Sequence, residues 1–268
     1  MTDHVQPDHQ HPPVTAAFFD VDRTLIAGAS ALRMAQPFRK GGLVTRRQQL
    51  RAALNQVAFS LMGADDSGIE RFATGVRDMI SGWDVEQMHR VIDTELDRRV
   101  RPTVYREAVD RISMHKRQGH SVYAVSATII DIIEPLAQML GLDGAVGSEL
   151  EIADGILTGE IAQLCHGEHK AARLRAFAAA HNIDLALSSA YSDSISDEHF
   201  LRAVGRPYAV NPDRELRKLA EAEGWGVLVF KQQMEVPLHR RRSTHASMAL
   251  ALAATAAAVG HRRRRSRS

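Results

Sequence analysis

Short hydrophobic runs, rich in β-branched and aromatic residues, alternate with longer helix-like stretches along most of this chain. Three of the runs, at 14–19, at 121–125 and from Leu185 onward, lead into polar residues. Strands that alternate with helices favour an α/β fold with a parallel sheet. We therefore predict a doubly wound, mainly parallel sheet with helices on both faces and ligand chemistry at the strand ends.

Two carboxylates follow the first run, in the segment Phe18-Phe19-Asp20-Val21-Asp22-Arg23-Thr24. Strand alternation aims Asp20 and Asp22 to the same side. Two like charges this close repel each other unless a cation or a proton intervenes, and Mg²⁺ prefers such oxygen ligands. The pair predicts a metal site with a nucleophile; the alternative is a surface turn, since two aspartates at this spacing are common by chance.

Two further segments carry groups that bind anions. The run 121–125 leads to Ser126 ahead of a helical stretch, where helix N–H groups favour an anionic oxygen. Lys170 is predicted in the first turn of a helix over 171–180, where the helix dipole opposes a cation unless an anion faces it. The ordinary alternatives are a helix N-cap for Ser126 and a solvated surface lysine for Lys170.

The segment from Leu185 ends in two carboxylates four residues apart, Asp193 and Asp197. They are predicted to complete the metal site begun by Asp20 and Asp22. Four weak signals in order, each at a strand-to-helix junction, are stronger together than each is alone.

This ordered set resembles the haloacid dehalogenase (HAD) superfamily, whose motifs are Asp-x-Asp-x-Thr, then Ser or Thr, then Lys, then an acidic pair. The resemblance covers about 16–231. Within the superfamily the chain looks most like the phosphoserine-phosphatase-like branch, subfamily IB. The finer likeness rests on the phrases at 18–22, 191–197 and 209–213.

The resemblance implies roles for these residues in a Mg²⁺-dependent phosphatase. Asp20 would be the nucleophile that becomes an aspartyl-phosphate, and Asp22 the general acid and base. Mg²⁺ would be held by the Asp20 side chain, the Asp22 backbone carbonyl and Asp193, with Asp197 in support. Two further residues would bind the phosphoryl oxygens, namely Ser126 and Lys170.

Two departures from the family pattern limit what the substrate can be. Arg23 stands where a small or amide residue is usual, and it is predicted either to contact substrate or to point to solvent. Phosphoserine phosphatases carry an acidic residue shortly after the first motif to bind the substrate ammonium, whereas this chain has Ala27-Gly28-Ala29-Ser30. Because an unpaired buried charge is costly, phosphoserine is not the expected substrate.

The chain divides into a catalytic core and a cap. We expect the core at 14–29 and 102–231, and a helical cap at 30–101 whose closure would exclude water and select the leaving group. The segment 150–161 predicts a hairpin around Asp154-Gly155. Residues 1–13 are polar and are expected to form a disordered tail.

Composition places the protein in a reducing compartment. A chain of 268 residues with 25% charged residues is ordinary for a folded enzyme. The single Cys165 excludes an intramolecular disulfide, and the N-terminus lacks the apolar stretch of a secretion signal. We therefore expect a cytoplasmic protein.

The tail at 232–268 is strongly basic. Residues 231–268 carry 9 Lys or Arg and 1 Glu, net +8, within a whole-chain net charge of +2, so the rest is −6. Its Ala/Leu-rich run at 246–259 is shorter than the roughly 20 residues of a membrane-spanning helix. The arginines on both sides favour binding at an anionic membrane surface on the inner face; a solvated tail is the alternative. Nucleic acid is not expected, because no aromatic residues are interleaved with the arginines.

The function predicted from sequence is therefore Mg²⁺-dependent hydrolysis of a small phosphorylated metabolite. One alternative is a regulatory or scaffolding protein that acts through its basic tail. Another is a phosphotransferase, because an aspartyl-phosphate can be passed to an acceptor other than water.

Overall fold

A computed structural model of the protein describes residues 13–43 and 80–234. The predicted disordered tail (apart from Pro13), the middle of the predicted cap and the basic tail beyond Met234 lie outside the described residues.

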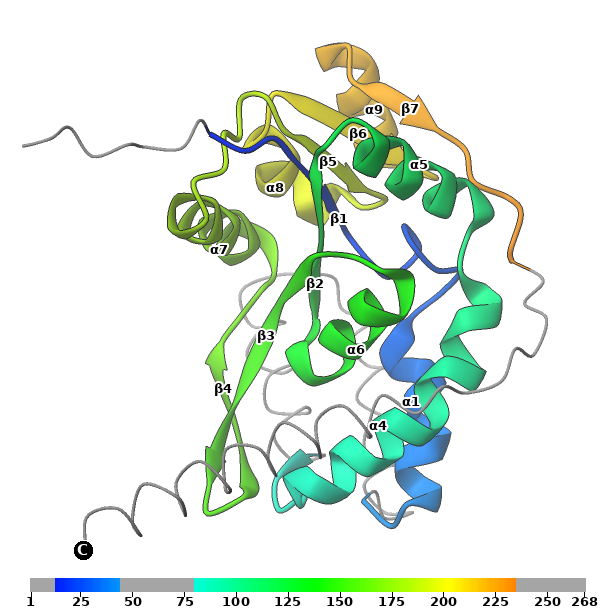
Figure 1. Ribbon diagram of the computed structural model, residues 1–268, viewed down its shortest axis with the longest axis vertical. Helices are drawn as coiled ribbons and strands as arrows, with labels where there is room; N and C mark the ends of the chain where they lie inside the picture. Colours follow the sequence, from blue (N-terminus) through cyan, green and yellow to red (C-terminus); the bar gives the residue numbers. More distant parts are fainter. Residues whose placement is uncertain (1–12, 44–79, 235–268) are drawn as a thin grey trace, which may run out of the picture. The chain divides into compact units, whose positions relative to one another are not determined.

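Seven strands form one sheet in the order β4-β3-β2-β1-β5-β6-β7 (Figure 1). All neighbours pair in parallel except β3 with β4, which are antiparallel. The predicted α/β fold with a mainly parallel sheet is confirmed. The strands are β1 Ala16–Phe19, β2 Ser121–Ile129, β3 Gly144–Ala153, β4 Ile156–Gln163, β5 Ser189–Ser192, β6 Arg206–Val210 and β7 Gly226–Leu228.

Helices connect these strands. The helices are α1 Ser30–Lys40, α4 Val85–Val100, α5 Arg106–Arg117, α6 Ile130–Leu140, α7 Gly167–Ala180, α8 Glu198–Arg202 and α9 Arg214–Glu223, with short 3₁₀ turns η1 Arg101–Thr103 and η2 Ile195–Asp197. Within the part of the chain that the structure describes, no helix is both long enough and apolar enough to cross a membrane.

The four residues of β1 are all buried and divide between two hydrophobic cores. Ala17 and Phe19 pack with residues of α5 and α6, whereas Ala16 and Phe18 pack with residues of α7, α8 and α9. Because successive side chains of a strand point to opposite faces, this division places helices on both faces of the sheet. The predicted doubly wound arrangement follows from it.

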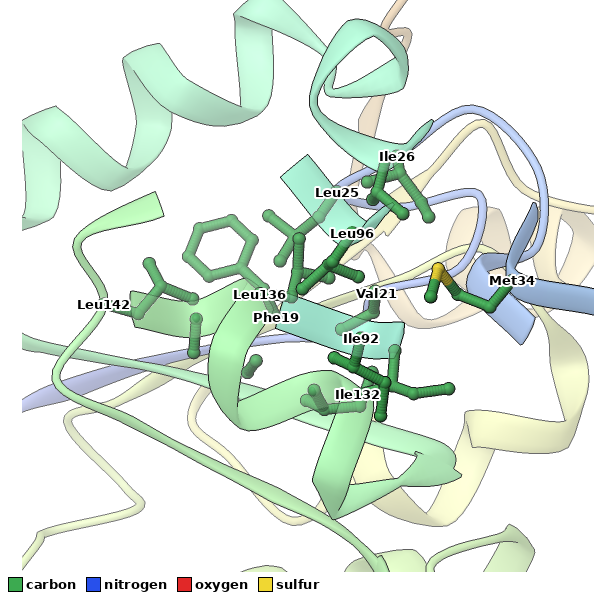
Figure 2. Packing of buried hydrophobic residues seen from close by; sticks show 14 of the residues in the cluster. Phe19, Val21, Leu25, Ile26, Met34, Ile92, Leu96, Ile132, Leu136 and Leu142 are labelled. Carbon is green, nitrogen blue, oxygen red and sulfur yellow. The ribbon is translucent and has the colours of Figure 1, made fainter. Parts of the chain in front are cut away.

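Helices α1 and α4, the described parts of the predicted cap, lie side by side (Figure 1). Met34 of α1 and Ile92 of α4 belong to the same buried cluster as Phe19 of β1, as Figure 2 shows. The two helices therefore share a core with one face of the sheet. Where the cap begins and ends stays a prediction.

The predicted hairpin is confirmed as β3 and β4. Asp154 and Gly155 at its tip have φ angles of 51° and 78°. Two successive left-handed residues are what a two-residue hairpin loop requires, and Asp-Gly adopts that conformation readily.

Candidate active site

Asp20 follows β1 at the carboxyl edge of the parallel sheet, where β1 lies between β2 and β5. Its backbone N–H donates to the carbonyl of Tyr191 in β5, with an N···O distance of 2.9 Å. Its side chain is buried. Strand order reverses around β1, and ligands of open α/β sheets bind at such a position.

Lys170 joins two of the predicted acidic residues. The ammonium of this fully buried lysine donates to Asp20 Oδ1 at 2.7 Å and to Asp197 Oδ2 at 2.6 Å. Ser192 Oγ donates to the same oxygen of Asp197 at 2.6 Å. Lys170 lies in the first turn of α7, as predicted, and the carboxylates explain why a cation is stable there.

Burial and charge shift the pKa values of these groups in opposite directions. Burial raises the pKa of Asp20 to about 7, although the nearby Lys170 lowers it in part. Burial also raises the pKa of Asp193, to about 6. For Lys170, burial lowers the pKa, but the carboxylates of Asp197 and Asp20 outweigh that effect and raise it.

Asp22 is held by groups from two other elements. Its Oδ1 accepts from the backbone N–H of Ser30 at the start of α1, at 2.8 Å. Its Oδ2 accepts from Thr128 Oγ1 in β2, at 3.3 Å. Because these contacts fix both oxygens of the carboxylate, Asp22 has a defined position beside Asp20.

Ser126 lies inside β2, and not at the start of a helix as predicted. The strand continues to Ile129, and α6 begins only at Ile130, because the pairing of β2 with β3 shifts register after Val125 instead of ending there. Ser126 is buried, and its Oγ accepts from the backbone N–H of Thr128 at 3.2 Å. Its hydroxyl proton is therefore available to an anionic oxygen.

Strand β3 holds this part of β2 in place. Ser148 Oγ donates to the carbonyl of Ala127 at 2.8 Å. A Cβ placed on Gly147 would lie 2.8 Å from the backbone nitrogen of Ile130 and 2.9 Å from the carbonyl oxygen of Thr128. Only glycine allows the two backbones to approach so closely.

Asp193 follows β5 and forms an ion pair with Arg23, with 2.6 Å between Asp193 Oδ2 and Arg23 Nη2. The side chain of Arg23 is thus partly exposed but not directed only to solvent, and whether it contacts substrate stays a prediction. The carbonyl of Asp193 accepts from the backbone N–H of Asp213 at 2.9 Å, which anchors the loop.

Sequence reasoning missed three residues that donate to the acidic groups: Ser30 through its backbone N–H, and Thr128 and Ser192 through their hydroxyls. Each lies in or next to a motif, but their partners are distant in the sequence. The sequence next to a motif does not indicate which distant carboxylate a serine or threonine will contact.

The donor set suits a Mg²⁺ ion. Within residues 13–43 and 80–234, no group of three or more His, Cys, Asp or Glu side chains is arranged to hold a metal. However, Mg²⁺ is usually bound through only one or two carboxylates and keeps several waters. Two buried carboxylates, Asp20 and Asp193, with the Asp22 carbonyl as an oxygen donor, fit that requirement.

The site has a buried lysine between two carboxylates at the carboxyl edge of a parallel sheet. This arrangement is that of a hydrolase whose central aspartate directly follows a strand. The chain belongs to the haloacid dehalogenase-like hydrolases, because the model of that family matches residues 17–202. The predicted resemblance, including the phosphoserine-phosphatase-like branch, is confirmed.

Relatives and solved structures agree with this assignment. The chain is 42% identical over 222 residues to a probable phosphatase of Mycobacterium tuberculosis, covering 83% of this chain and 77% of the relative. It is 33% identical over 229 residues to a phosphoserine phosphatase of the same species, covering 83% and 74%. A phosphoserine phosphatase structure with a phospho-aspartyl intermediate analogue shares the fold, with a TM-score of 0.57, 20% identity and 82% and 95% coverage.

Proposed function

We propose that this protein is a Mg²⁺-dependent phosphomonoesterase that acts through an aspartyl-phosphate on Asp20. The observation that carries the proposal is the contact of Lys170 with Asp20 and Asp197. A carboxylate attacks a phosphoryl group only where cations screen the charge on both, and Lys170 supplies one cation beside the nucleophile.

The first displacement forms a bond between an oxygen of Asp20 and phosphorus while the bond from phosphorus to the leaving oxygen breaks. Asp22 gives its proton to that leaving oxygen. Ser30 and Thr128 support this assignment because they hold Asp22 in place. Ser126 and Lys170 donate to the phosphoryl oxygens.

The second displacement releases phosphate. A water oxygen bonds to phosphorus as the bond from Asp20 to phosphorus breaks, and Asp22 takes the proton of that water. Dividing one hydrolysis into two displacements lowers the barrier of each. Asp20, Asp193 and the carbonyl of Asp22 would hold Mg²⁺, which supplies further screening of negative charge. Asp197 supports the site through Lys170.

The substrate class is a small phosphorylated metabolite without an ammonium group near the phosphate. The guanidinium of Arg33 donates to the carbonyl of Ala27, within the stretch where phosphoserine phosphatases carry an acidic residue. Arg33 Nη2 also lies 3.4 Å from where a Cβ of Gly28 would be. A cation in this place repels an ammonium, so phosphoserine should be a poor substrate.

Phosphate release from a panel of phosphorylated metabolites, with Mg²⁺ and with a chelator, tests this proposal. We expect turnover of at least one compound to require Mg²⁺ and to fall by at least about a thousandfold in Asp20→Asn, because the nucleophile is lost. Asp97→Asn, on the exposed side of α4, is the control for loss of a carboxylate. Near-normal activity of Asp20→Asn would exclude the mechanism, and no turnover of any compound would favour the regulatory alternative.

The proposed location is cytoplasmic, with the basic tail at the inner face of the membrane. The +8 charge of residues 231–268 supports it. Full-length protein that fails to sediment with anionic vesicles at low salt would remove the membrane part of the proposal.

A further inference from the structure

Arg23 occupies a backbone conformation that suits glycine or asparagine better. Its φ angle is 63°, in the left-handed region that L-residues other than glycine and asparagine rarely adopt. Its backbone N–H donates to the carbonyl of Gly28 at 3.2 Å, so the loop after Asp22 closes on itself. A favourable interaction of the Arg23 side chain is therefore expected to offset this backbone conformation.

The side chain of Arg23 contacts a carboxylate of the proposed metal site. Arg23 Nη2 lies 2.6 Å from Asp193 Oδ2. The Asp193 side chain is 7% exposed, whereas that of Arg23 is 60% exposed. Lys170 contacts the other two acidic residues, Asp20 and Asp197. Each of the three acidic residues is therefore paired with one of the two cations.

We propose that Arg23 is a built-in counter-ion of Asp193 that competes with Mg²⁺ and thereby sets the metal affinity of the site. The inference rests on the proposed function, since it requires Asp193 to be a Mg²⁺ ligand. Arg23 is a positioning residue here and not a catalytic one.

Arg23 competes with Mg²⁺ for Asp193 regardless of which carboxylate oxygen the metal binds. If Mg²⁺ bound Oδ2, it would share with the guanidinium the negative charge of one oxygen, and the two cations would repel each other. If Mg²⁺ bound Oδ1, the guanidinium would remain paired with the same carboxylate, and its charge would repel the metal. Both arrangements weaken binding relative to a neutral residue at position 23.

The exposure of Arg23 distinguishes it from the other cation of the site. Lys170 is 1% exposed and makes two short contacts, so it is fixed. Arg23 reaches Asp193 from the solvent side, and its long side chain can turn into water when the metal enters. The exposed position also makes the competition sensitive to salt.

Isothermal titration of the full-length protein with Mg²⁺, without substrate, tests the proposal. Arg23→Gln removes the charge but keeps the unbranched side chain and its backbone strain, whereas Arg23→Lys keeps the charge. Arg98→Gln is the matched control, because Arg98 is 61% exposed and also pairs with a carboxylate, that of Glu95.

We expect Arg23→Gln to bind Mg²⁺ about 3- to 30-fold more tightly than the wild type, as loss of a partly screened repulsion predicts. Arg23→Lys and Arg98→Gln should stay close to the wild type, and the gain in Arg23→Gln should shrink in high salt. Unchanged or weaker binding by Arg23→Gln would overturn the inference and leave the proposed function intact. A wild type that binds no Mg²⁺ would overturn the metal requirement, and the inference with it.

Discussion

At the scale of single residues, Lys170 decides the electrostatics of the site. A buried charge is stable only when it is paired, and Lys170 has two carboxylates at 2.6–2.7 Å. Conversely, Asp20 and Asp197 are buried acidic groups for which this ammonium is the shared cation. The three side chains therefore form one unit, in which removing the cation harms both acids.

Lys170→Met should lower the free energy of unfolding by about 3–5 kcal/mol, because it leaves two buried carboxylates uncompensated. Urea denaturation at neutral pH measures this loss. Lys116→Met is the control: Lys116 pairs with Asp143 on the surface, and its loss should cost less than about 1 kcal/mol. Equal effects of the two substitutions would contradict the role given to Lys170.

At the scale of elements, the approach of β3 to the end of β2 positions the polar groups of the site. Gly147 allows contact with the backbone at 128–130, and Ser148 holds the carbonyl of Ala127. Thr128, which donates to Asp22, lies in the same segment. The geometry of the proposed acid and base therefore depends on a glycine in a neighbouring strand.

Gly147→Ala should destabilise the protein by about 1–3 kcal/mol through overpacking. It should also lower kcat more than it changes KM, because the shift of Thr128 displaces Asp22. Gly144→Ala in the same strand is the control, since its Cβ would meet only the Tyr123 ring, at 3.5 Å. Urea denaturation and phosphatase kinetics of both variants test this prediction. Equal losses of stability and of kcat in the two variants would contradict the role given to Gly147.

At the scale of the whole molecule, one face of the sheet carries a stack of aromatic rings beneath the site. Phe19, Tyr191 and Tyr208, from β1, β5 and β6, stack with centroid separations of 4.2 and 4.8 Å. His115 of α5 bonds the Tyr191 hydroxyl through Nε2 at 2.8 Å, and its Nδ1 lies 3.0 Å from Nδ1 of His120. The stack thus links the strands around Asp20 to a buried histidine.

The pH dependence of stability should reflect His115. Burial, together with the charges of His120, Arg111 and Arg206, lowers its pKa from 6.5 to about 4. Because the unfolded chain then binds the proton first, stability is full above about pH 6.5 and falls as the pH drops toward 4, by at most about 3 kcal/mol.

His115→Gln keeps a polar side chain but cannot titrate. The variant should therefore gain about 2 kcal/mol relative to the wild type between pH 7 and pH 4.5. Urea denaturation of both proteins across this range measures the difference in their free energies of unfolding. The carboxylates are common to both proteins, so their contribution cancels in this difference. Parallel stability curves for the two proteins would exclude His115 as the titrating group.

Local sequence pattern determined the fold class and the acidic and basic positions of the site. The buried run of β1, the Asp-Gly turn between β3 and β4 and the placement of Lys170 in a first helical turn are all decided within a few residues, by strand alternation, turn conformation and helix dipole. Such features can be predicted from sequence because their causes are local.

The tertiary structure alone decided which groups meet. Lys170 reaches Asp20 across 150 positions of sequence, and Asp22 reaches Thr128 across 106. Ser126 lies within a strand because pairing with β3 extends it, and Arg23 finds Asp193 because β1 and β5 are neighbours. These outcomes depend on strand order and on close approach of backbones, which arise from packing across the whole sheet and leave no local pattern in the chain.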